Sequence, residues 1–285
     1  MRGFFVVSRQ IQTEKITVGN WEWFYREIPN DANPLTVILL HGIPAHSYTW
    51  RNLMPLIASA GYRVIAPDWL GSGFSSKPNK REFKYTTTEF TKVLGEFIAA
   101  LELEKIALVT QGFGASAGIQ YALNHPHIVE KLIILNTPIA ANTKLPWLMQ
   151  QWTIPLVGDM LTQDPLLVDR TLEKGSGFVI EDKDLDKLRK PYLETSAVGR
   201  ALISITKQLN LKETGETLSL GLETFNQPSL ILWGLADSWL DAQVARAIAA
   251  SNEKIEFVGL EGAKHYPQEH WSKEIAPELL SFLRR

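Results

Sequence analysis

Short, continuous apolar runs alternate with helix-like segments along most of this chain of 285 residues. Runs of this length without polar interruptions are typical of strands that are covered on both faces. Residues 14–28 alternate instead and predict two antiparallel strands, with Gly19-Asn20 as the turn. Thr36–Leu40 is the clearest such run, and further short strands are expected at Arg63–Ala66, Ile106–Val109, Leu132–Leu135, Ser229–Trp233 and Ile255–Val258. The helical patterns lie near 50–60, 88–103, 114–124, 241–250 and 269–284. This order predicts an α/β fold with a mostly parallel sheet of about eight strands.

The alternation breaks between residues 139 and 227, where the apolar spacing is helical and no strand pattern is convincing. A stretch of this length is too long for a loop. We therefore expect a core domain formed by 1–138 and 228–285, with 139–227 inserted after the sixth strand as a helical cap that covers a site. A small second domain unrelated to the site is the alternative interpretation.

Composition excludes several classes of partner and chemistry. The net charge of −2 gives no reason to expect nucleic acid or an anionic membrane as a partner. The absence of cysteine removes disulfides and thiolate chemistry. No uncharged apolar stretch is long enough to span a membrane, and the apolar run in Met1–Ser8 is too short for a secretory signal. We expect a soluble, cytoplasmic protein without a transmembrane segment.

The segment Leu108-Val-Thr-Gln-Gly-Phe-Gly-Ala-Ser-Ala-Gly118 predicts a strand, a sharp turn and a helix. Hydrolytic enzymes carry their nucleophile on such a turn, in the pattern G-x-nucleophile-x-G. Aligned on Gly114, the nucleophile position falls on Gly112, which has no side chain to attack a substrate. Ser116 is the nearest hydroxyl, but it lies one helical turn further on and is expected to face the strand packing.

The segment His41-Gly-Ile-Pro44 directly follows a buried strand. In this position the pattern is typical of one half of an oxyanion hole, whose donors would be the backbone N–H groups of Ile43 and Phe113. Neither donor needs a particular side chain, so the hole can persist beside Gly112. A plain Gly-Pro turn is the alternative.

An aspartate and a histidine complete the pattern. Asp237 lies just past the end of one strand, and His265 lies in the loop after the next. In this order the acid orients the imidazole, which acts as a base. A helix N-cap before Leu240 is the alternative role for Asp237. His265, Glu269 and His270 lack the spacing of a zinc motif, so no metal and no cofactor are expected.

Two further segments resemble haloalkane dehalogenases and related epoxide hydrolases of the α/β-hydrolase superfamily. They are residues 41–55, from His41 to Pro55, and residues 66–78, from Ala66 to Pro78. The resemblance implies an α/β-hydrolase fold in which an elbow aspartate attacks carbon and a histidine–acid pair activates water to break the ester. It places the acid at Asp237 and the base at His265.

The chain departs from that family at three positions. Gly112 stands where the nucleophile is expected. Ile43 and Phe113 match the oxyanion or halide positions, but they stand where dehalogenases generally have asparagine and tryptophan, whose side chains donate to the leaving halide. We therefore expect no dehalogenation, and epoxide hydrolysis would need the same nucleophile.

Three hypotheses follow. The favoured one is a hydrolase-like protein with little or no catalysis that binds a small apolar ligand or a protein partner. The alternative is a hydrolase without a covalent intermediate, in which His265 and Asp237 activate water on an ester-like or other lipophilic substrate. The third is a normal hydrolase inactivated by engineering at Gly112. For the first two we expect an apolar pocket under the cap, lined by Trp147, Leu148, Ile154, Leu156 and Tyr192. A tightly packed cap with no cavity is the alternative.

Overall fold

A computed structural model describes residues 10–30 and 33–285. The segment Met1–Ser8, on which the expectation of no secretory signal rests, lies outside the described residues. Within the described ranges no helix combines the length and apolar character needed to cross a bilayer.

The described residues form one eight-stranded sheet in the order β1-β2-β4-β3-β5-β6-β7-β8. The pairs β1–β2 and β2–β4 are antiparallel, and the others are parallel. The strands are β1 (Gln12–Val18), β2 (Trp21–Ile28), β3 (Thr36–Leu40), β4 (Arg63–Pro67), β5 (Ile106–Gln111), β6 (Val129–Leu135), β7 (Ser229–Gly234) and β8 (Ile255–Leu260). The expected mostly parallel α/β fold is confirmed.

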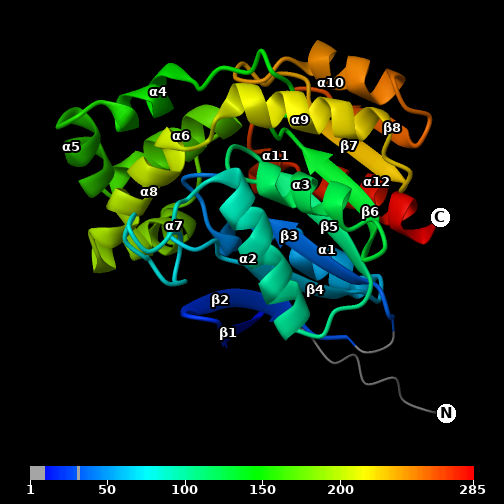
Figure 1. The fold of residues 1–285 in the computed structure, drawn as a ribbon, viewed down its shortest axis with the longest axis horizontal. Coiled ribbons are helices and arrows are strands. Elements are labelled where there is room, and N and C mark those ends of the chain that lie inside the picture. Colours follow the sequence, from blue (N-terminus) through cyan, green and yellow to red (C-terminus); the bar gives the residue numbers. More distant parts are fainter. Residues whose placement is uncertain (1–9, 31–32) are drawn as a thin grey trace.

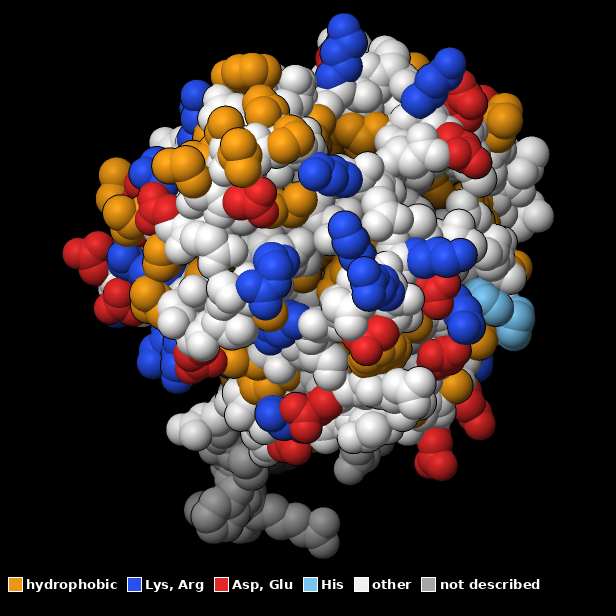
Figure 2. Space-filling model, turned by 60° about the vertical axis from the view of Figure 1, so that its left-hand side comes forward, with side chains coloured by type: hydrophobic (Ala, Val, Ile, Leu, Met, Phe, Trp, Pro, Cys, Tyr) orange, Lys and Arg blue, Asp and Glu red, His pale blue; other side chains and the backbone are white. Residues whose placement is uncertain are grey.

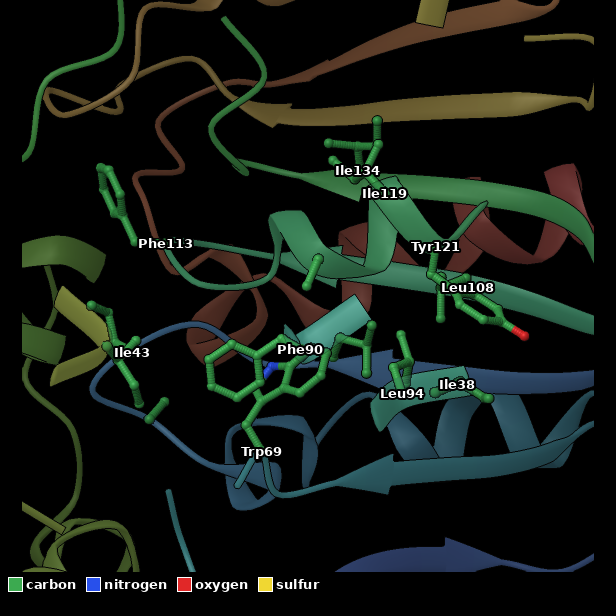
Figure 3. Packing of buried hydrophobic residues seen from close by; sticks show 14 of the residues in the cluster. Ile38, Ile43, Trp69, Phe90, Leu94, Leu108, Phe113, Ile119, Tyr121 and Ile134 are labelled. Atoms are coloured by element: carbon green, nitrogen blue, oxygen red, sulfur yellow. The ribbon is translucent and has the colours of Figure 1, made fainter. Parts of the chain in front are cut away.

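Successive side chains of each buried strand point to opposite faces of the sheet, so helices cover both. Val37 and Leu39 pack in one cluster with α1 (Met54–Ser59) and α12 (Ser272–Arg284). Ile38 and Leu40 pack in the other cluster. There they meet α2 (Thr87–Ala100), α3 (Ser116–Asn124) and α10 (Ala242–Ala250). Figure 3 shows Ile38 of β3, Leu108 of β5 and Ile134 of β6 on this second face.

The stretch between β6 and β7 is fully described and contains helices but no strand. Its helices gather at one end of the sheet, except α9, which runs back over the core beside α3 (Figure 1). They are α4 (Trp147–Gln150), α5 (Val157–Gln163), α6 (Leu166–Ser176), α7 (Asp182–Glu194), α8 (Ala197–Lys207) and α9 (Leu211–Glu223), with the short 3-10 helix η2 (Gln151–Thr153) after α4. A second 3-10 helix, η1 (Ser47–Trp50), lies in the core between β3 and α1. Buried side chains of α6, α8 and α9 belong to the same cluster as the sheet. Residues 139–227, called the cap below, therefore pack on the core, and their role as a lid stays a prediction.

Candidate active site

The turn after β5 has the geometry of a strand–turn–helix elbow. Gly112 follows the strand with φ +76°, and Gly114 has φ +92°. Glycine adopts this left-handed region without the steric cost that a side chain imposes. A β-carbon added to Gly112 would lie 3.3 Å from the Gly42 Cα and 3.5 Å from the His265 Nε2. The position where a nucleophile would begin therefore faces the imidazole.

Asp237 and His265 are brought together at the ends of β7 and β8. The Asp237 Oδ2 lies 2.9 Å from the His265 Nδ1, and both side chains are about 1% exposed. The other carboxylate oxygen accepts from the backbone N–H groups of Trp239 and Leu240. Asp237 thus caps the turn before Leu240 and orients the imidazole at the same time, because each role uses a different carboxylate oxygen.

Asn136 is a partner of this pair that the sequence reasoning missed. Its Nδ2 donates to the Asp237 Oδ2 at 2.8 Å, and its Oδ1 accepts from the Gly234 N–H at 2.9 Å. The residue is buried and has φ +38°. An asparagine tolerates this conformation better than most residues. Its only signal in the sequence was a polar residue directly after a buried strand.

The second imidazole nitrogen has no partner in the part of the chain that the structure describes. The His265 Nε2 is buried and makes no hydrogen bond with any described residue. Three aromatic rings surround the imidazole, with centroid distances of 5.2 Å to Phe113, 4.8 Å to Trp239 and 4.8 Å to Tyr266. The neighbouring Nδ1 faces a carboxylate, which favours the tautomer with a proton on Nδ1 and a lone pair on Nε2. A buried polar atom left unpaired in this way marks a place where a ligand atom or water can bind.

The two expected oxyanion donors are placed side by side, and Ile43 and Phe113 lie beyond the ends of their strands (Figure 3). The Ile43 N–H donates to the Phe113 carbonyl at 2.9 Å, so this donor is already in use. The Phe113 N–H donates to no acceptor among the described residues. The oxyanion role of both groups stays a prediction, and Phe113 is the better-placed donor.

Tyr192 reaches the oxyanion loop from the cap. Its hydroxyl donates to the Pro44 carbonyl at 3.2 Å, and the Tyr266 hydroxyl donates to the Ile43 carbonyl at 2.7 Å. Burial raises the pKa of Tyr192, so its hydroxyl stays protonated at neutral pH. Tyr192 thus joins the cap to the loop after β3, and Tyr266 joins the loop that carries His265 to the same loop.

The other expected pocket residues lie further out. Trp147 is 66% exposed, Ile154 is 38% exposed and Leu156 is 78% exposed, while Leu148 is half-buried. Much of the first three side chains therefore faces solvent in this conformation. The Ser116 hydroxyl donates to the Pro138 carbonyl, so it is occupied in packing the loop after β6.

An ion-pair network connects the site to the cap. Arg51, near the end of η1, donates to Glu269 at 2.8 Å and lies 3.0 Å from Asp184 on α7. These two carboxylates raise the pKa of Arg51, although its burial opposes them. The Tyr48 hydroxyl also donates to Asp184. Helix α7 is therefore fastened to the core beside the loop that carries His265. No three His, Cys, Asp or Glu side chains of the described residues are placed to share a metal ion.

A mostly parallel sheet with a glycine elbow after β5 and an Asp–His pair after β7 and β8 defines a protein of the α/β-hydrolase class. The family model for the alpha/beta hydrolase fold matches residues 36–270, and the chain belongs to this family. A haloalkane dehalogenase from Mesorhizobium japonicum is 26% identical over 270 residues, which cover 88% of this chain and 85% of the relative. A cis-3-alkyl-4-alkyloxetan-2-one decarboxylase from Xanthomonas campestris is 24% identical over 279 residues, which cover 91% of each protein.

The fold is also shared with solved structures. A haloalkane dehalogenase from Bradyrhizobium elkani superposes with a TM-score of 0.85 at 22% identity, covering 96% of this chain and 98% of that one. At this identity the likeness supports the fold and not the reaction.

Proposed function

We propose that this protein hydrolyses a small lipophilic ester-like substrate by direct attack of water, without a covalent intermediate. One observation carries the proposal. The His265 Nε2 is buried, has no partner among the described residues, and faces the vacant side-chain position of Gly112 while Asp237 holds the other nitrogen. A protein that only binds a ligand has no need for an imidazole oriented by a carboxylate that is itself held by Asn136.

The proposed reaction uses the dyad as a general base and then as a general acid. The His265 Nε2 removes a proton from water as the water oxygen attacks the carbonyl carbon. Asp237 stabilises the imidazolium that forms. The Phe113 N–H is the candidate donor to the carbonyl oxygen as it becomes negative. The imidazolium then returns its proton to the departing alkoxide, giving an acid and an alcohol.

One hollow comes near the dyad through Trp239, whose ring lies against His265. It has a volume of about 200 Å³, and neither His265 nor Gly112 lines it. Its lining is mixed, with apolar side chains such as Ile139 and Leu240 beside polar ones such as Thr137, Asn142 and Lys144. This volume is smaller than that of most ligand pockets, so a compact ligand fits it best.

Dehalogenation is not part of the proposal, although named relatives carry it out. Displacing a halide from carbon needs a nucleophilic side chain at the elbow, and Gly112 has none. The side chains of Ile43 and Phe113 also have no donor for a halide. We expect no halide release from haloalkanes.

A binder without catalysis is the second candidate, and a different observation favours it. The backbone N–H of Ile43 already donates to the Phe113 carbonyl. The backbone N–H of His265 donates to the Gly175 carbonyl of the cap at 2.8 Å. A β-carbon on Gly175 would lie 2.4 Å from the Tyr266 ring, so helix α6 packs directly on the catalytic loop. A site sealed in this way suits long retention of a ligand.

A panel of p-nitrophenyl esters separates the two candidates. The proposal expects turnover by the unmodified protein that falls about a hundredfold or more in His265→Ala and Asp237→Asn. The exposed His127→Ala variant serves as the control and should keep the rate of the unmodified protein. Turnover no faster than in buffer would favour the binder instead, and turnover that survives both substitutions would exclude the dyad as its source. If turnover is absent, Gly112→Ser tests whether the dyad can still activate a nucleophile.

A further inference from the structure

The cap carries an exposed apolar face that its core packing does not use. We call it the apolar face, and it consists of Trp147, Ile154, Leu156, Val157 and Met160 on and around α4 and α5. These side chains are between 38% and 78% exposed. Figure 2 shows hydrophobic side chains gathered over this part of the molecule, with Lys and Arg side chains beside them on the same face. Contiguous exposed apolar surface of this kind is typical of an interaction site.

Leu156 at the start of α5 is the most exposed member and the most unusual. It has φ +66° and ψ −47°, a backbone conformation with positive φ that a leucine adopts at a steric cost. Its side chain is 78% exposed, so no burial within the chain offsets that cost. Strained residues that persist without a packing reason tend to mark functional surfaces.

A cationic hollow adjoins the apolar face. It has a volume of about 400 Å³ and is lined by Lys77, Lys80, Arg200 and Lys207, with Asp159 of α5 at its edge. None of these four cations forms an ion pair with a carboxylate of the described residues. Lys77 and Lys80 belong to the core, between β4 and α2, and Arg200 and Lys207 belong to α8 of the cap. The hollow thus holds four cations beside a single acidic group.

Asp159 shows that the two features share one side of the molecule. On α5 the residues at 156, 159, 160 and 163 fall on neighbouring positions of one helix face. Leu156 and Met160 belong to the apolar face, and Asp159 lines the hollow. One partner can therefore contact apolar and cationic groups together.

We propose that this side of the cap docks on the surface of an anionic phospholipid bilayer. The apolar face would enter the boundary between headgroups and acyl chains, and the cationic hollow would take lipid phosphates. Burial lowers the pKa of Lys77 to about 8, and a phosphate beside the ammonium would oppose that shift. A second copy of this chain fits the surface less well, because a twofold contact would bring two sets of unpaired cations together.

Vesicle sedimentation tests the proposal. The full chain should bind vesicles of phosphatidylcholine with about one-third phosphatidylglycerol more tightly than vesicles of phosphatidylcholine alone. The double variant Lys80→Glu with Arg200→Glu should weaken binding to the anionic vesicles about twentyfold or more, at about fivefold for each cation lost. The double variant Leu156→Asp with Met160→Asp should abolish it.

Matched controls lie elsewhere on the surface. Leu220→Asp changes a leucine that is 65% exposed on α9, and Lys273→Glu changes an exposed lysine on α12. Both should bind vesicles as the unmodified protein does. The unfolding midpoint of every variant checks that it is folded.

A second measurement needs no disruptive substitution. Brominated phosphatidylcholine in the anionic vesicles should quench the tryptophan fluorescence of the unmodified protein more than that of Trp147→Phe. The proposal is overturned by failure to bind anionic vesicles, or by binding and quenching that none of the variants changes. A third outcome also overturns it: the protein does not bind vesicles but self-associates with rising concentration, and Leu156→Asp removes that self-association.

Discussion

The Gln111 Nε2 donates to the backbone carbonyl of His265 at 2.7 Å. Gln111 is the last residue of β5, directly before the elbow glycine, so this bond ties the elbow to the loop that carries the imidazole. The Gln268 Nε2 in turn donates to the Gln111 Oε1 at 3.1 Å and to the Thr49 hydroxyl at 2.9 Å. The distance between Gly112 and His265 is therefore fixed by side chains outside the dyad.

Replacing Gln111 by alanine should loosen this tie. The substitution leaves the buried His265 carbonyl without its donor, which costs about 1–3 kcal/mol of unfolding free energy. Urea denaturation measures the cost, and the NMR chemical shifts of the His265 ring report its position. Gln120→Ala on α3 removes an exposed glutamine bond to Asn124 and should change neither quantity. Equal effects of the two substitutions would contradict the positioning role of Gln111.

Gly112→Ala tests how much space the elbow holds. A left-handed conformation with a side chain costs about 1–2 kcal/mol, and the new β-carbon also meets Gly42 at 3.3 Å. Gly19 is a matched control, because it has φ +58° and nothing within 4 Å of an added β-carbon. Denaturation should show Gly112→Ala to be more destabilising than Gly19→Ala. If the two costs are equal, the elbow has room for a methyl group and contact with Gly42 is relieved easily.

His46 should make the protein less stable in acid. It accepts from the Tyr48 N–H through Nδ1, and burial lowers its pKa from 6.5 to about 4. Between these values the unfolded chain binds the proton and the folded chain does not, so stability is full above pH 6.5 and falls as the pH drops toward 4. The loss amounts to about 3 kcal/mol.

The same measurement on His46→Gln isolates this contribution. Glutamine keeps a donor and an acceptor but does not titrate, so the slope of stability between pH 6.5 and 4 should become shallower. Burial also lowers the pKa of His41, and that residue is unchanged in both proteins. His127→Gln, at an exposed site, should keep the slope of the unmodified protein. An unaltered slope in His46→Gln would mean that His46 is protonated in the folded state.

Glu269→Gln should destabilise the chain by about 3 kcal/mol or more. The Glu269 side chain is fully buried, and its two oxygens accept from Arg51 and from the Thr49 hydroxyl. The substitution removes the negative charge that faces the buried Arg51 guanidinium. The comparison is Glu194→Gln on α7, which breaks an exposed pair with Lys190 and should cost less than about 0.5 kcal/mol. Hydrogen exchange should also quicken in α7 of Glu269→Gln. Similar costs for the two variants would show that Arg51 does not fasten the cap.

The fold was predictable because its signals are local. Continuous apolar runs such as Thr36–Leu40 mark strands buried on both faces, and the turn at Gly19-Asn20 marks the antiparallel start. The pairing of Asp237 with His265 followed from chain order, because the ends of neighbouring parallel strands meet at one edge of a sheet. These relationships depend on sequence spacing and on the geometry of parallel sheets.

Other parts of the site depend on contacts between distant segments. Asn136 was missed because a single polar residue after a strand has many possible roles, and only the fold places it on Asp237. The Phe113 carbonyl occupies the Ile43 N–H through a backbone contact that side-chain types do not encode. Trp147 and Ile154 were expected under the cap, yet their helical spacing fits an exposed face equally well.

The sequence by itself determined the α/β architecture, the helical character of the stretch between β6 and β7, and the absence of a side chain at Gly112. Each of these depends on residues that are close together in the chain. Net charge, which counts residues without placing them, gave no reason to expect an anionic membrane. Only the tertiary structure gathered Lys77 and Lys80 with Arg200 and Lys207 beside an exposed apolar face. Local charge and exposure are set by which distant segments pack together, and that packing decided what the cap presents to a partner.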